Sequence, residues 1–154
     1  MNTSFDITIS SKSAIDIDRD IRQNLQMNTQ KWPKAQSGVL NLPSPFALQD
    51  GGELNQAQVF YESYGQLNSA ADNAILVFTG LSASAHARSS ILNHNAGWWE
   101  TMIGPNCALN TDKFHVIVVN SLGSCFGSTG PGSMNPTTGH AYEFDFPTLR
   151  IEDI

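Results

Sequence analysis

The chain has 154 residues, of which 40% are hydrophobic and only 14% are charged, and its formal net charge is −6. This length suffices for one domain with its own core. The 8 basic residues are scattered, which argues against a nucleic-acid surface or a polybasic membrane patch. No apolar run approaches the ~20 residues that span a bilayer, and the N-terminus lacks the pattern of a secretory signal. We therefore expect a soluble, cytoplasmic protein without nucleic-acid or membrane partners.

The cysteines and histidines do not form a metal-binding pattern. Cys107 and Cys125 make neither a C-x-x-C pair nor a disulfide framework, so reduced thiols are the simpler interpretation. The histidines lack metal-ligand spacing, and they are His86, His94, His115 and His140. We expect no metal and no resident cofactor.

Residues 1–37 are rich in Ser, Asp, Asn, Gln and Thr, and their few isoleucines define no apolar face. This composition predicts a poorly ordered N-terminal extension with one transient helix over residues 18–27. From residue 38 the apolar pattern becomes regular, and no linker is visible after that point. We expect a single domain of α/β class over residues 38–154.

The first part of this domain is predicted to be an antiparallel hairpin. Apolar residues alternate loosely over residues 39–48, a turn contains Asp50-Gly51-Gly52, and alternation resumes over residues 57–64. Two buried strands, residues 74–79 and 114–120, are expected next. Short apolar runs rich in β-branched side chains and bounded by turn residues are typical of parallel sheets covered on both faces.

The segments after these two strands are predicted to carry the chemistry, because α/β proteins place their sites at the C-terminal ends of parallel strands. Both segments are rich in Gly and Ser, and residues 121–142 form a long irregular loop of the kind that is usually functional or disordered. Residues 97–103 are expected to form a short helical turn. From residue 147 the chain resembles the start of an amphipathic helix, with Glu152 and Asp153 at its positive end. A chain that stops there indicates truncation.

Residues 80–84 admit three interpretations. A nucleophile elbow would need the pattern G-x-S-x-G leading into a helix, and the last position here is Ser84, so Ser82 is a weak nucleophile candidate. An oxyanion loop, in which backbone N–H groups face developing negative charge, fits better. A tight turn without chemistry is the third possibility.

Three other features are weaker candidates. Cys125 lacks the nearby base or positive charge that a reactive thiolate needs, so a packed loop cysteine is favoured. Residues 127–132 are Gly-rich but lack the GK[ST] ending of a phosphate-binding loop. Trp98 and Trp99 either wall a substrate pocket or anchor a turn in the core, and aromatic pairs are more often packing.

Several motifs in order carry a resemblance to a known family. They are Leu81-Ser82-Ala83-Ser84-Ala85-His86, Gly97-Trp98-Trp99-Glu100, Met102-Ile103-Gly104-Pro105, Asn110-Thr111-Asp112, Asn120-Ser121-Leu122-Gly123-Ser124-Cys125, Gly127-Ser128-Thr129-Gly130-Pro131, Asn135-Pro136-Thr137-Thr138-Gly139 and Asp145-Phe146-Pro147. On these motifs, the chain resembles the N-terminal part of a MetX-type homoserine O-acyltransferase, in the α/β-hydrolase superfamily. The resemblance is dense over residues 74–154 and loose over residues 38–73.

The resemblance implies a two-step acyl transfer from acetyl-CoA or succinyl-CoA, as co-substrate, to L-homoserine or L-serine in methionine or cysteine synthesis. It also implies a homodimeric parent. The family's Ser, His and Asp follow later in the chain, so none of them can be assigned here. Leu81 matches a leucine whose backbone N–H is an oxyanion donor. Residues 97–105 and 120–131 match segments bordering the substrate tunnel, which makes substrate-binding candidates of Ser82, Trp98, Trp99, Gly123 and Ser124.

Two departures from the family pattern concern the substrate. Many members have Leu-Thr-Gly-Asp where this chain has Leu81-Ser82-Ala83-Ser84, and Leu-Gly-Gly-Cys where it has Leu122-Gly123-Ser124-Cys125. Serine as acceptor and a succinyl donor therefore stay open. We expect the N-terminal half of an α/β-hydrolase domain, inactive alone. The alternatives are part of an esterase, or a non-catalytic domain that needs a partner chain.

Overall fold

The computed structural model describes residues 15–16, 18–19, 32–80 and 82–154. The chain divides into two compact units, Met1–Lys31 and Trp32–Ile154. In the first unit the described residues are helical, and Arg19 forms an ion pair with Asp16 at 3.7 Å. The rest of the helix predicted over residues 18–27 lies outside the described residues. The sheet and the candidate site belong to the second unit.

The predicted antiparallel hairpin is confirmed. β1 (Ala35–Asn41) pairs along its whole length with β4 (Gln58–Tyr64). The short strands β2 (Phe46–Ala47) and β3 (Glu53–Leu54) form a separate ladder at the hairpin tip. Between them, Gly51 and Gly52 have φ angles of 87° and 86°, which side chains disfavour. β1 includes residues 35–37, which the sequence pattern assigns to the N-terminal extension.

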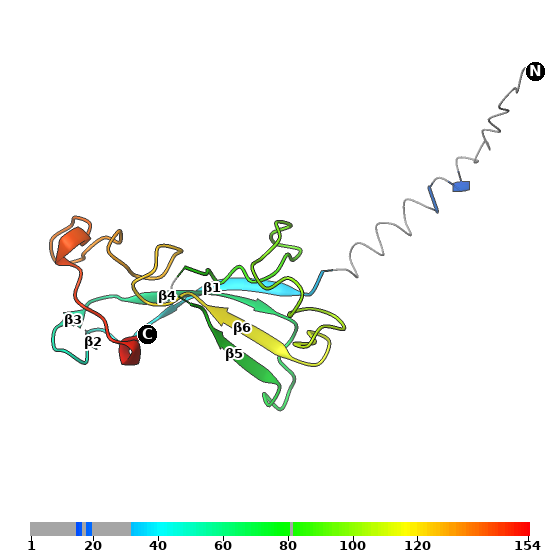
Figure 1. Ribbon diagram of the computed structural model, residues 1–154, viewed down its shortest axis with the longest axis horizontal. Helices are drawn as coiled ribbons and strands as arrows, with labels where there is room; N and C mark the ends of the chain where they lie inside the picture. The colour runs from blue at the N-terminus through cyan, green and yellow to red at the C-terminus, as the bar shows by residue number, and fades with distance from the viewer. Residues whose placement is uncertain (1–14, 17, 20–31, 81) are drawn as a thin grey trace, which may run out of the picture. The chain divides into compact units, whose positions relative to one another are not determined.

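The two later strands pair in parallel, as the sequence predicts. β5 (Ala74–Phe78) pairs in parallel with β6 (His115–Val119), and β6 also pairs antiparallel with β4. The resulting mixed sheet has the order β1-β4-β6-β5 (Figure 1). An antiparallel hairpin that leads into parallel strands is therefore confirmed as the architecture. Because β6 lies beside β5, the segments that leave these two strands begin next to each other.

The described residues do not supply the cover expected over both faces of residues 74–79. In β6, Val116 and Val118 are fully buried, whereas in β5 Leu76 is 53% exposed and Phe78 is 64% exposed. Within the part of the chain that the structure describes, β5 has one neighbour in the sheet, which is β6.

Two apolar clusters pack on this sheet. One lies at the hairpin tip, and its buried members are Leu48, Leu54, Ala57, Leu122 and Tyr142. The other lies between the strands and the connection from β5 to β6, and its buried members are Tyr64, Ala87, Ile103, Val116 and Val118. That connection contains hydrogen-bonded turns, one of them at residues 98–102 where the sequence predicts a helical turn, and no helix among its described residues. It nevertheless covers the sheet as a crossover helix would.

The segment after β6 is anchored to the hairpin at two places. Near its start, the side-chain oxygens of Ser128 and Thr129 each accept a hydrogen bond of 2.9 Å from the backbone of β4. Near its end, the amphipathic helix expected from residue 147 is a single 3₁₀ turn, η2 (Ile151–Asp153), preceded by η1 (Glu143–Asp145). The buried Asp153 carboxylate accepts hydrogen bonds from the backbone N–H groups of Arg150 and Gln49. This returns the red end of the chain in Figure 1 to β2 and β3.

Within the described ranges, no helix combines the length and the apolar character that crossing a membrane would require.

Candidate functional site

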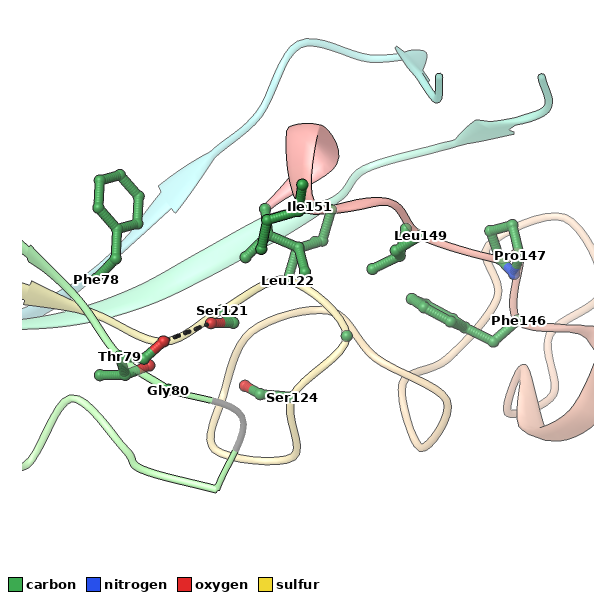
Figure 2. Close-up of a pocket in the computed structure, with 12 residues that line it drawn as sticks. Phe78, Thr79, Gly80, Ser121, Leu122, Ser124, Phe146, Pro147, Leu149 and Ile151 are labelled. Carbon is green, nitrogen blue, oxygen red and sulfur yellow. Dashed lines mark hydrogen bonds between the residues drawn. The ribbon is translucent and has the colours of Figure 1, made fainter. Parts of the chain in front are cut away.

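A pocket of about 640 Å³ opens where the parallel strands β5 and β6 end (Figure 2). Its walls come from three segments that are far apart in the sequence. Phe78, Thr79 and Gly80 come from the end of β5, residues 121–124 follow β6, and the third wall returns from the C-terminal segment. The residues of that third wall are Phe146, Pro147, Leu149, Ile151 and Ile154. Open α/β sheets bind ligands at this position, beyond the C-terminal ends of their parallel strands, because the loops that follow two adjacent strands begin at the same edge of the sheet.

The pocket is apolar with a small polar side, and none of the described residues that line it is charged. Its polar side consists of the hydroxyls of Thr79, Ser121 and Ser124 together with backbone groups. Thr79 donates through Oγ1 to the carbonyl of Val119 at 3.2 Å, and Ser121 donates through Oγ to the carbonyl of Thr79 at 3.4 Å. Two hydroxyls are thus held by the backbone of the strands themselves, which fixes their direction.

Ser124 differs from the other two hydroxyls. Its Oγ is buried and has no hydrogen-bond partner among the described residues, although a buried polar atom is normally paired. The backbone N–H of Ser124 donates to Ser121 at 3.1 Å, which closes a tight turn and carries the side chain toward Gly80 (Figure 2). Gly123, in this turn, has φ of 85° and donates its N–H to Thr129 at 2.7 Å.

The predicted site residues fall into three groups. Gly123 and Ser124 line the pocket. Ser82 is exposed, and Trp98 and Trp99 lie on the β5–β6 connection; none of the three is among the lining residues. The oxyanion donor expected at Leu81 lies outside the described residues, although Gly80, directly before it, lines the pocket. The structure therefore brings together only part of the predicted set.

The two tryptophans stack on each other, with ring centroids 5.2 Å apart and planes 15° apart. Trp99 packs against the cluster that contains Tyr64, whereas Trp98 is 43% exposed and donates its indole N–H to the carbonyl of Ser84 at 2.7 Å. The pair thus anchors the turn at residues 98–102 and also ties it to the loop after β5.

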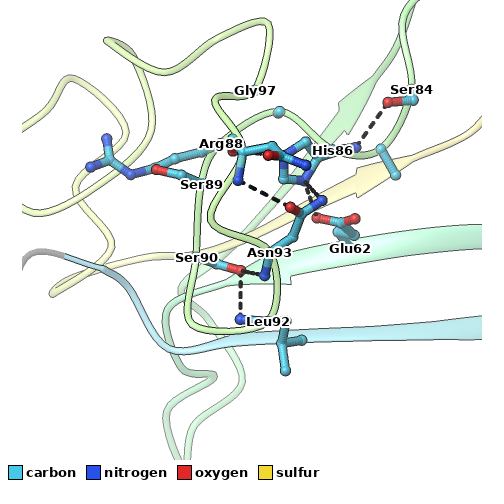
Figure 3. Close-up of polar contacts among 12 residues, drawn as sticks. Glu62, Ser84, His86, Arg88, Ser89, Ser90, Leu92, Asn93 and Gly97 are labelled. Atoms are coloured by element: carbon cyan, nitrogen blue, oxygen red, sulfur yellow. Dashed lines mark hydrogen bonds and ion pairs between the residues drawn. The ribbon is translucent and has the colours of Figure 1, made fainter. Parts of the chain in front are cut away.

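A buried polar network that the sequence did not predict holds the loop after β5 against β4. Tyr64 is fully buried, donates to Glu62 Oε2 at 2.8 Å, and accepts from the backbone N–H groups of Ala87 and Arg88 at 3.1 and 3.2 Å. His86 Nδ1 lies 3.1 Å from the same Glu62 oxygen (Figure 3). Burial, and next the bond to Glu62, raise the pKa of Tyr64 well above its ordinary value. The phenol therefore stays protonated and can make all these bonds.

A second network closes the other end of this connection. Arg88 is buried and donates to the backbone carbonyls of Glu100 and Ile103. The Glu100 carboxylate accepts from the Ser89 hydroxyl, the Ser89 N–H and the Gly97 N–H. Partial burial acts to raise the pKa of Glu100, but the bonds from Ser89 and Gly97, with the nearby guanidinium, outweigh it and hold the pKa below its usual range. These bonds fix the loops without a helix.

The described residues contain no serine whose hydroxyl is hydrogen-bonded to a histidine ring, because His86 contacts Glu62 and the carbonyl of Asn95. Nor do they contain a group of three or more His, Cys, Asp or Glu side chains that could hold a metal. Cys125 is exposed and Cys107 is partly buried, and both are free thiols. The arrangement can offer backbone N–H groups and hydroxyls to a bound group, beside an apolar wall.

Comparison with curated proteins gives strong sequence matches to part of longer enzymes. The serine O-succinyltransferase of Litchfieldella anticariensis is 55% identical over 115 residues, which are 75% of this chain and 31% of that protein. The L-serine/homoserine O-acetyltransferase of Streptomyces lavendulae is 54% identical over 118 residues, 77% of this chain and 32% of that protein. The chain thus spans about a third of the length of these relatives. No protein-family model matches it.

Comparison with solved structures gives the same fold. The homoserine O-acetyltransferase from Bacillus anthracis matches with a TM-score of 0.70 and 31% identity, covering 77% of this chain and 34% of that one. Esterase E22 matches with the same TM-score and 35% identity, covering 78% and 34%. Both similarities extend over most of the described second unit.

Proposed function

The chain is a relative, in sequence and in fold, of the serine and homoserine O-acyltransferases with an α/β-hydrolase fold, and from this relationship we propose that it forms the oxyanion side of an acyl-CoA-dependent O-acyltransferase. The names of its relatives give the acceptor as serine or homoserine and the transferred group as succinyl or acetyl. We propose the same class of reaction here, in the cytoplasm, with acyl-CoA as co-substrate and L-serine or L-homoserine as acceptor. The homodimer stays a prediction.

The observation that carries this proposal is the identity of 55% over 115 residues with a serine O-succinyltransferase. The chemistry of the pocket supports it. An acyl thioester is uncharged at its reacting carbon, and the pocket offers an apolar wall, three hydroxyls and the backbone of residues 79–80 without a charged side chain. The backbone N–H of Leu81 is our proposed oxyanion donor, because preorganised N–H groups stabilise the charge that develops on a carbonyl oxygen under attack.

The test is an assay of the product of the whole coding region that contains this sequence, beside the 154-residue chain. Each is mixed with acetyl-CoA or succinyl-CoA and with L-serine or L-homoserine. Released CoA is followed with a thiol reagent and the O-acyl amino acid by mass spectrometry. We expect acceptor-dependent transfer by the whole product and none by residues 1–154 alone, whose described part contains no hydroxyl–histidine pair. A whole product that transfers no acyl group to either acceptor would overturn the proposal.

The esterase match favours a second candidate, hydrolysis of a simple ester on the same scaffold. An acyl-enzyme that is attacked by water rather than by an amino-acid hydroxyl gives hydrolysis. The same assay separates the two, because an esterase cleaves a p-nitrophenyl ester at a rate that added serine or homoserine does not change, and it forms no O-acyl amino acid.

A further inference from the structure

Asn120 is a fully buried residue directly after β6, and its four polar groups bond to β4, to the loop after β5 and to the loop after β6. Its backbone N–H donates to Phe60 in β4 at 2.9 Å, and its backbone carbonyl accepts from the Ser128 hydroxyl at 2.9 Å. Its side-chain Oδ1 accepts from the backbone N–H of Ala85, and its Nδ2 donates to the backbone carbonyl of Phe126. A buried amide that left either side-chain atom unpaired would be destabilising.

The two side-chain bonds require one acceptor and one donor on the same short side chain. An N–H group at Ala85 can only donate, and a carbonyl at Phe126 can only accept, so the oxygen and nitrogen of the amide have one possible assignment. Aspartate of the same shape lacks the donor when it is ionised, and leucine lacks both groups. The position therefore specifies an amide by chemistry as well as by size.

These bonds join the two loops that form the polar side of the pocket. Ala85 belongs to the loop that follows β5 and begins at Gly80, and Phe126 belongs to the loop that follows β6 and includes Ser121 and Ser124. Two other side-chain bonds link the two segments close to the strand ends, from Thr79 to Val119 at 3.2 Å and from Ser121 to Thr79 at 3.4 Å. The buried Asn120 side chain adds a link between residues that lie farther along the two loops.

We propose that Asn120 is a positioning residue of this site, which fixes the loop after β5 against the loop after β6 and so sets where the loop after β5 lies relative to the serine hydroxyls. That backbone N–H groups of this loop serve as oxyanion donors rests on the proposed function. The bridge between the loops does not, and it has a readout of its own.

Hydrogen exchange of the 154-residue chain, read by mass spectrometry, tests the bridge. Asn120→Ala should speed exchange in both residues 82–90 and residues 121–127 by about tenfold or more and leave β1 unchanged. The matched control is Asn93→Ala, since the Asn93 amide contacts only His86 and Asn95 within the first loop. The control should speed exchange in the first loop alone. Faster exchange in only one loop of Asn120→Ala, or equally in β1, would overturn the proposal.

Asn120→Asp gives a second test that does not depend on how well the alanine variant folds. The ionised carboxylate of this variant keeps an acceptor for Ala85 but faces the Phe126 carbonyl without a donor. At neutral pH, residues 121–127 should therefore exchange faster while residues 82–90 stay protected. The protonated form of the introduced carboxyl can donate to Phe126. Protection of residues 121–127, corrected for intrinsic rates, should therefore be greater at acidic pH than at neutral pH. Loss of protection in both loops at every pH would contradict the bridge.

Activity measurements on the whole product then connect the bridge to catalysis. Asn120→Ala should lower kcat by about 10- to 100-fold with a smaller change in KM, because misplacing catalytic groups by even 1 Å costs about this much. Asn120→Asp should regain relative kcat as the pH falls, which Asn120→Ala should not. A wild-type product without acyl transfer would overturn the proposed function but leave the exchange result intact. An unchanged kcat beside faster exchange in both loops would remove Asn120 from the site.

Discussion

The hydroxyl of Tyr64 is one oxygen atom that accepts from two buried loop amides and donates to one carboxylate. Tyr64→Phe removes that atom and leaves the ring, so no cavity larger than the hydroxyl forms in the cluster around Val116 and Val118. The backbone N–H of Arg88, a residue that is 9% exposed, loses its acceptor, whereas the N–H of Ala87 keeps the Ala85 carbonyl at 2.8 Å. Replacing this tyrosine therefore isolates the polar contribution from the packing contribution.

The expected loss of stability is about 3 kcal/mol. A buried donor left without a partner costs about 1–3 kcal/mol. Only the Arg88 N–H is left unpaired, since the Ala87 N–H keeps the Ala85 carbonyl, so the middle of that range, about 2 kcal/mol, applies once. The lost bond from the phenol to Glu62 at 2.8 Å adds about 1 kcal/mol, since Glu62 keeps its contact with His86. For a chain of this size, about 3 kcal/mol corresponds to a Tm lower by about 6–12 °C.

Urea unfolding, followed by tryptophan fluorescence and circular dichroism, measures this loss. The control is Tyr61→Phe, on the same strand, whose hydroxyl makes no hydrogen bond with the described residues and should matter by less than about 0.5 kcal/mol. If Tyr64→Phe unfolds within about 1 kcal/mol of Tyr61→Phe, the Arg88 amide is satisfied in some other way and the reasoning fails.

The stability difference between the wild type and Tyr64→Phe is also expected to depend on pH in the alkaline range. The pKa of Tyr64 is raised in the folded chain, so the native state holds this proton at a pH where the unfolded state has released it. The stabilisation is complete below the unfolded pKa of about 10 and is lost as the pH rises above it. The difference in unfolding free energy between wild type and Tyr64→Phe should therefore narrow above about pH 10. A constant difference from pH 8 to pH 11 would contradict the shift.

Three further predictions concern other residues. The lowered pKa of Glu100 stabilises the fold at neutral pH, and this stabilisation is lost as the pH falls below about 4. The free energy of urea unfolding should therefore fall less between pH 5 and pH 3 in Glu100→Gln than in the wild type. An equal fall in both proteins would contradict this. Gly130→Ala would place a Cβ 2.4 Å from the Ser124 carbonyl oxygen and should destabilise the fold by about 2 kcal/mol or more in thermal unfolding. In Gly132→Ala the added Cβ meets nothing within 4 Å, so this variant should be nearly neutral. Equal Tm values for the two variants would refute the clash. Leu81→Pro removes the proposed oxyanion N–H and should lower kcat of the whole product by about 100-fold with KM little changed, whereas Leu81→Ala keeps the N–H; similar kcat values for the two variants would remove this N–H from the mechanism.

The sheet was predictable because its signals are local. Short β-branched runs between turn residues identify the strands, and the Asp50-Gly51-Gly52 turn identifies the hairpin. Composition does not show how much of the cover over β5 this chain supplies, and Phe78 lies 64% exposed among the described residues. The short helical turn predicted at residues 97–103 is matched by a turn at residues 98–102, whereas the helix expected from residue 147 is the single 3₁₀ turn η2.

The candidate site was predictable only in part, for a related reason. Gly123 and Ser124 were found because they directly follow a strand and match a family motif. The third wall of the pocket, which includes Phe146 and Leu149, returns from a segment that no periodicity connects with the sheet. Long-range bonds such as Asn120 to Ala85 have no counterpart in a local pattern. A buried asparagine at the end of a strand, followed by a Gly/Ser-rich loop, is the one signal that could have identified it.

Hydrogen bonds from side chains to the backbone hold the loops that build the pocket. A crossover helix would instead be held by hydrogen bonds within its own backbone. In a helix each residue can be exchanged with little effect on the path of the chain. Here the path of the loops is held by a few side chains that bond to their backbone, those of Tyr64, Arg88 and Asn120 among them. A change at one of these side chains is therefore expected to shift a loop while the strands keep their register. A scaffold with that property suits a group of enzymes whose names differ in acyl donor and in acceptor.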